Sequence, residues 1–68
     1  MLKQPPQESR GVNDLFMKAE KKRIDKLNEM LGDLELTPDE EKVLVWLCGW
    51  DDWTINNVMS ILNKIREI

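Results

Sequence analysis

The side chains most able to do chemistry lie in one short stretch, residues 46–53. It holds all three tryptophans, Trp46, Trp50 and Trp53, and the only cysteine, Cys48, while the chain has no histidine and no tyrosine. Nucleophilic catalysis needs a thiol or hydroxyl beside a base, and here the single thiol lies in an apolar run with no histidine to activate it. The sequence therefore predicts a protein that is not an enzyme and has no catalytic residue.

The clustered carboxylates have a structural explanation. Residues 39–41 are all acidic and follow a predicted helix start, and Asp51 and Asp52 precede another. Acidic side chains at such positions cap free N–H groups and lie at the positive end of the helix dipole. The chain also lacks a cluster of histidines and cysteines for a metal and a glycine-rich phosphate loop. We therefore expect no metal, no cofactor and no small-molecule substrate.

The corner formed by Trp50, Asp51, Asp52 and Trp53 is the best candidate for a binding site. Full burial of two tryptophans at a tight corner is difficult, and an exposed tryptophan is a frequent anchor at protein interfaces. With two aspartates beside it, such an anchor suits a basic or amphipathic partner. The alternative is that the tryptophans wedge helices apart in the core, and this is what we expect of Trp46.

A second candidate surface is the only basic cluster of the chain. Lys18, Lys21, Lys22 and Lys26 lie within one predicted helix and are interleaved with acidic residues. A basic helix face can contact nucleic acid, but interleaved charges of both signs are more typical of a solvated surface. We therefore expect no nucleic-acid partner and keep DNA binding through this face as the alternative.

A central helix over residues 38–48 positions the candidate corner. Thr37, Pro38 and Glu40 have the types and spacing of a capping box with proline at the first helical position. The apolar run 43–48 that follows points to every side of the helix axis. One neighbouring element cannot cover such a helix, so we expect several others to surround it.

Two further helices complete the predicted fold, which is all-α. The first spans about residues 13–31 and the third about 53–67, with a strongly amphipathic pattern in the third. Residues 1–11 contain two adjacent prolines and few large apolar side chains, which predicts a flexible arm before a single helical domain over 12–68.

Two charges interrupt the apolar face of the first helix. Glu20 and Arg23 lie in the middle of that face. We interpret them as an i,i+3 ion pair whose methylene stems lie over the neighbouring helix. A charged layer that fixes the register of a helix interface is the other interpretation.

Size and charge limit the partners. A chain of 68 residues buries a small core, and with one cysteine it has no disulfide to stabilise it, so we expect a homodimer, either packed or helix-exchanged. Residues 1–32 carry seven basic and five acidic side chains and residues 33–68 carry three and eight, giving net charges of +2 and −5. No apolar run is long enough for a membrane span or a signal peptide, so we expect a cytoplasmic protein with no membrane partner.

Residues 36–44, Leu-Thr-Pro-Asp-Glu-Glu-Lys-Val-Leu, resemble the opening of the helix-turn-helix in response-regulator output domains and in region four of sigma factors. That resemblance implies a scaffold helix, but the polar turn and basic recognition helix of those families are replaced here by Gly-Trp-Asp-Asp-Trp. More loosely, the C-terminal half is similar to small proteins of phages and mobile elements of low-GC Gram-positive bacteria.

Together these features predict a non-enzymatic protein–protein interaction module. We expect this module to be a phage or mobile-element regulator or inhibitor that acts by occupying the surface of a host protein. The alternative is a helix-turn-helix-like DNA-binding regulator that uses the basic face of the first helix.

Overall fold

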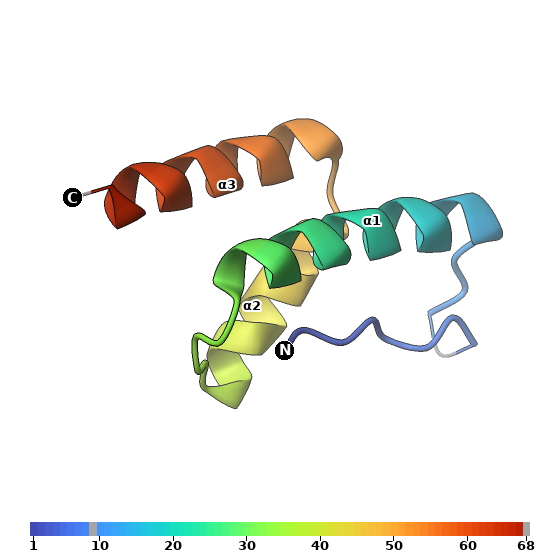
Figure 1. Ribbon diagram of the computed structural model, residues 1–68. Helices are drawn as coiled ribbons and strands as arrows, with labels where there is room; N and C mark the ends of the chain where they lie inside the picture. Colours follow the sequence, from blue (N-terminus) through green and yellow to red (C-terminus); the bar gives the residue numbers. More distant parts are fainter. Residues whose placement is uncertain (9, 68) are drawn as a thin grey trace.

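The chain folds into three helices around a small core (Figure 1). The computed structural model describes residues 1–8 and 10–67, and in these ranges it contains no strand. The helices are α1 (Asp14–Leu31), α2 (Pro38–Cys48) and α3 (Asp52–Arg66). The all-α, three-helix prediction is confirmed, and the helix limits agree with it to within one residue.

Each helix begins at a side chain that caps it. Asn13, Thr37 and Asp51 each accept a hydrogen bond from the backbone N–H of the third residue of the helix that follows. At α2 the capping box is complete, because the Glu40 side chain also accepts from the Thr37 N–H at 2.8 Å. At the other end of α1, Gly32 has φ 57°, a conformation that favours glycine, and there the chain turns back.

The core is assembled from all three helices and from the N-terminal segment, by which we mean the described residues before α1, 1–8 and 10–13. Its buried apolar side chains are Leu2, Ile24, Leu27, Cys48 and Ile55. Leu2 comes from the N-terminal segment, and the side-chain amide of Asn28 holds its backbone in place. The Leu2 N–H donates to the Asn28 Oδ1 at 2.7 Å, and the Leu2 carbonyl accepts from the Asn28 Nδ2 at 3.0 Å. In Figure 1 this segment runs back beneath α1 and ends beside α2. The predicted flexibility of residues 1–11 concerns motion and stays a prediction, whereas the contribution of Leu2 to the core was not expected.

One side of α2 is uncovered, contrary to the expectation that other helices surround it. Cys48 is its only buried residue, whereas Val43 is 56% exposed and Trp46 is 62% exposed. The prediction that Trp46 is a core residue is therefore wrong. Two neighbouring helices and one extended segment have too little surface to enclose a helix that is apolar on every side.

Within the described part of the chain, no helix combines the length and the apolar character that crossing a membrane requires.

The docking of the N-terminal segment can be tested with one substitution. Leu2→Ala should lower the free energy of unfolding by about 2–3 kcal/mol, because it leaves a cavity in a core of very few side chains. Leu15→Ala is the matched control, since Leu15 is 77% exposed and its loss should change little. Urea unfolding followed by tryptophan fluorescence measures both. Equal stabilities of the two variants would mean that Leu2 does not pack in solution.

Candidate functional site

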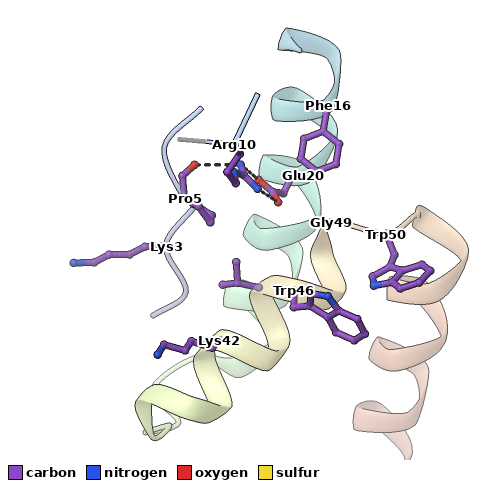
Figure 2. Close-up of a pocket in the computed structure, with 10 residues that line it drawn as sticks. Lys3, Pro5, Arg10, Phe16, Glu20, Lys42, Trp46, Gly49 and Trp50 are labelled. Atoms are coloured by element: carbon purple, nitrogen blue, oxygen red, sulfur yellow. Dashed lines mark hydrogen bonds and ion pairs between the residues drawn. The ribbon is translucent and has the colours of Figure 1, made fainter. Parts of the chain in front are cut away.

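A pocket of about 520 Å³ opens between the N-terminal segment, α1 and α2. Figure 2 shows Arg10 and Glu20 at one end of it, Lys3 and Lys42 along one side, and the tryptophan rings on the opposite side. The lining residues lie far apart in the sequence, so three separate interactions are needed to bring them together.

The first interaction is a buried ion pair between α1 and the N-terminal segment. The Glu20 carboxylate is buried and accepts from both terminal nitrogens of Arg10, at 2.7 and 2.9 Å, and from the Gln4 side-chain amide at 3.0 Å. The Arg10 guanidinium also lies 5.5 Å from the centre of the Phe16 ring, within the range of a cation–π contact. The hydrogen bonds from Arg10 lower the pKa of Glu20 below its usual value, and the same bonds raise the pKa of Arg10. This pair closes one end of the pocket.

The second interaction joins α1 to the corner between α2 and α3. Arg23 is 6% exposed, and its Nε donates to the Cys48 carbonyl at 2.6 Å while its Nη1 lies 3.1 Å from the Asp52 Oδ1. A positive charge at the carboxyl end of a helix is favourable because the helix dipole is negative there. Arg23 thus binds the last carbonyl of α2 and the first residue of α3 at once.

The expected i,i+3 pair between Glu20 and Arg23 is wrong. Among the described residues Glu20 pairs with Arg10, and Arg23 pairs with Asp52. Both side chains leave the same face of α1, but each points to a different part of the chain. They act as a charged layer that positions neighbouring segments, although within one chain.

The third interaction is the close approach of the corner to α1 at Gly49. A Cβ atom at this position would lie 3.3 Å from the Trp46 carbonyl oxygen and 3.6 Å from the Glu20 Oε2. The tight contact is with the Trp46 carbonyl, whereas the distance to the Glu20 oxygen is an ordinary van der Waals contact, so the corner lies directly against the buried carboxylate. On either side of it, the rings of Trp46 and Trp50 meet edge to face, with centroids 5.5 Å apart and planes at 81°. Trp46 and Trp50 are 62% and 58% exposed, so they form an aromatic pair that faces solvent.

Of the four residues predicted to bind a partner, the structure brings only Trp50 to the pocket. Asp51 caps α3, and its hydrogen bonds with the Thr54 side chain and N–H lower its pKa. Asp52 is paired with Arg23. Trp53 is 75% exposed but lies outside the pocket lining.

Sequence reasoning missed three residues of the site. Trp46 was assigned to the core because it lies in the apolar run of α2, and no helical spacing relates it to Trp50, which follows the end of α2. Lys3 and Lys42 line the pocket from the N-terminal segment and from α2, and no local pattern relates them.

The lysines of the alternative nucleic-acid surface are all exposed on α1. They are Lys18, Lys21, Lys22 and Lys26. The Nζ of Lys21 lies 3.0 Å from the Asp25 carboxylate, which neutralises part of this face. None of the four lines the pocket beside the tryptophans.

Cys48 is buried in the core, and burial raises the pKa of its thiol to about 11. At neutral pH the thiol is therefore protonated, and a protonated thiol is a poor nucleophile. In the part of the chain that is described, no three side chains of the metal-binding types come together.

Comparison of the chain with protein-family models, with curated proteins and with solved structures gives no match. Conclusions about function therefore depend on the site alone.

The buried pair gives a pH-dependent prediction. Because the pKa of Glu20 is lowered in the folded chain, the stabilisation it supplies is present above its usual value of 4.5 and is lost as the pH falls through the lower folded value. Glu20→Gln should lower the free energy of unfolding by about 1–3 kcal/mol at neutral pH. This loss is smaller than for a fully buried ion pair because Arg10 is partly exposed to solvent. In acid, where Glu20 is protonated, variant and wild type should converge.

The matched control is Asp25→Asn, which removes the exposed pair with Lys21 and should change stability by less than about 0.5 kcal/mol. Urea unfolding at a series of pH values measures both variants. A Glu20→Gln protein as stable at neutral pH as the Asp25→Asn protein would contradict a structural role for the buried pair.

Proposed function

We propose that this protein is a non-enzymatic protein-binding module and that the tryptophan face, defined as Val43, Trp46 and Trp50, is its binding surface. The observation that carries the proposal is the edge-to-face pair of Trp46 and Trp50, more than half exposed and held at the rim of a pocket. Tryptophan is enriched among the residues that dominate binding energy at protein interfaces. A pair fixed by packing also loses little side-chain freedom on binding.

The exposed area supports association as part of the function. The chain exposes 5365 Å², whereas a folded monomer of 8.0 kDa is expected to expose about 4,450 Å². The excess of about 900 Å² is close to the roughly 800 Å² that each partner buries in a standard protein interface. The radius of gyration, 12.3 Å against about 11 Å expected for this length, agrees with an open shape. One interface would bring the chain to the exposure of an ordinary globular protein.

A second copy of the chain is a natural occupant for another apolar surface, on α3. Val58, Ile61 and Ile65 lie at helical spacing on one side of α3, and Ile61 and Ile65 are 56% and 60% exposed. Leu34, which is 62% exposed, lines a pocket of about 370 Å³ together with Ile65. We infer a homodimer formed through this α3 surface, which leaves the tryptophan face free for another protein.

The biological role that we propose, a phage or mobile-element regulator or inhibitor, comes from the sequence and goes beyond what the site supports. A short chain with a fixed aromatic face suits a regulator or inhibitor that acts by covering a surface of a host protein. The alternative function is DNA binding through Lys18, Lys21, Lys22 and Lys26, which are all exposed; of these four only Lys21 has an ion pair within 4.0 Å among the described residues.

The tryptophan face can be tested without knowing the natural partner. Peptides selected from a displayed random library against the full chain should bind the Trp46→Ala and Trp50→Ala proteins at least about ten-fold more weakly, as expected for central anchors. Trp53→Ala is the matched control, because Trp53 is an exposed tryptophan outside the pocket. Fluorescence anisotropy of labelled peptides gives the dissociation constants. Failure to select any binder, or binding that is indifferent to Trp46, would contradict the proposed function.

The dimer has its own test. Sedimentation equilibrium of the wild type should show reversible dimers, and Ile61→Glu with Ile65→Glu should raise the dimer dissociation constant at least about ten-fold, because it places charge in an apolar interface. Asn56→Glu with Asn63→Glu adds the same charge on the opposite, exposed side of α3 and serves as control. A wild type that is monomeric at every concentration would exclude the dimer.

A further inference from the structure

The pocket beside the tryptophans is positively charged although the whole chain has a net charge of −3. Lys3 and Lys42 both line it, and among the described residues neither ammonium group has a carboxylate within 4.0 Å or a hydrogen-bond partner. The one carboxylate in the lining, Glu20, is already neutralised by Arg10. The two lysines therefore leave an uncompensated charge of about +2 at the rim of the pocket.

None of the eight acidic residues in positions 33–68 lines the pocket, and four of them have partners of their own. Glu40 completes the capping box of α2, and Glu41 lies 3.5 Å from the N-terminal amine. Asp51 caps α3 and Asp52 pairs with Arg23. The sequence suggests a basic partner for this region, but Lys3 and Lys42 at the pocket would repel a positively charged group.

We propose that the pocket binds an acidic segment of another protein, in which a large apolar side chain adjoins an aspartate or glutamate. The apolar side chain would pack on Trp46 and Val45, and the carboxylate would lie at the outer edge of the pocket, on the side of Lys3 and Lys42. Figure 2 shows both lysines on the same side of the pocket, with their ammonium groups directed outward, and the aromatic pair on the other side. The proposal depends on the proposed function and adds the chemistry of the partner to it.

The lining favours a carboxylate over a phosphate group. Proteins commonly bind phosphate with the fork of a free arginine or with the N–H groups at a helix N-terminus. In this pocket Arg10 is the only arginine, and both of its terminal nitrogens are bound to Glu20. The stretch of α2 that lines the pocket, residues 42–46, lies beyond the first turn of the helix, so its N–H groups are used within α2. Two separate ammonium groups beside Pro5 and Val45 suit a single negative charge next to an apolar side chain.

The test combines the displayed peptide library with two charge variants of the full chain. Peptides selected against the wild type should be enriched in aspartate or glutamate next to a large apolar residue. Lys3→Gln with Lys42→Gln should weaken their binding about five-fold at low salt, the effect expected from losing two exposed ion pairs, and added salt should reduce the difference. Lys18→Gln with Lys22→Gln removes the same charge from α1, outside the pocket, and should leave binding unchanged.

The possible results separate this proposal from the proposed function. Basic or uncharged peptides that still require Trp46 would overturn the acidic specificity and leave the tryptophan face as a binding surface. If no peptide distinguishes wild type from Trp46→Ala, both proposals fail. Tight binding of a single-stranded oligothymidylate that depends on Lys3 and Lys42 would overturn the proposal in favour of nucleic acid. Loss of self-association in the Lys3→Gln, Lys42→Gln protein would overturn it in favour of a second copy of the chain.

Discussion

The fold depends on two opposite charges buried three residues apart on the inner face of α1. Glu20 and Arg23 are 1% and 6% exposed, and a charge taken out of water at such depth is costly unless it is paired and hydrogen-bonded. Each finds its partners in a different part of the chain. Glu20 is bound by the N-terminal segment through Arg10, and Arg23 is bound to the corner between α2 and α3. The two charges therefore tie the N-terminal residues and the corner to α1, in addition to the five apolar side chains of the buried core.

The same requirement shapes the surface. The N-terminal segment, held against Glu20, forms one wall of the pocket, and the corner that Arg23 holds carries Gly49 and Trp50. Because the charged residues Glu20 and Arg23 occupy two positions on the inner face of α1, less apolar surface remains there to cover α2. Trp46 is left in contact with Trp50 and solvent. The exposed aromatic pair is thus a consequence of how the interior is stabilised.

The sequence predicts the helices well and their contacts poorly, and the difference is physical. Helix limits follow from local chemistry: Thr37, Pro38 and Glu40 determine the start of α2 whatever packs around it. The burial of Trp46 depends instead on how many other segments pack around α2. The two other helices, α1 and α3, are too few to enclose a helix that is apolar on every side. The partner of Glu20 lies ten residues away in a segment without periodicity, where no pattern marks Arg10. Lys3 and Lys42 likewise meet only once that segment docks.

Charge illustrates the limit of composition most clearly. The net charge of −5 on residues 33–68 suggests a basic partner. Net charge, however, is a sum over many residues. A ligand responds mainly to unpaired charges within about one Debye length of it, roughly 8–10 Å. Here helix caps and ion pairs engage several of the acids, including Glu40 and Asp52. The lysines that line the pocket are unpaired among the described residues, so the pocket lining has a net charge of about +2 while residues 33–68 have a net charge of −5. In a chain this small, the pairing of charges during folding therefore decides which partner the exposed surface suits.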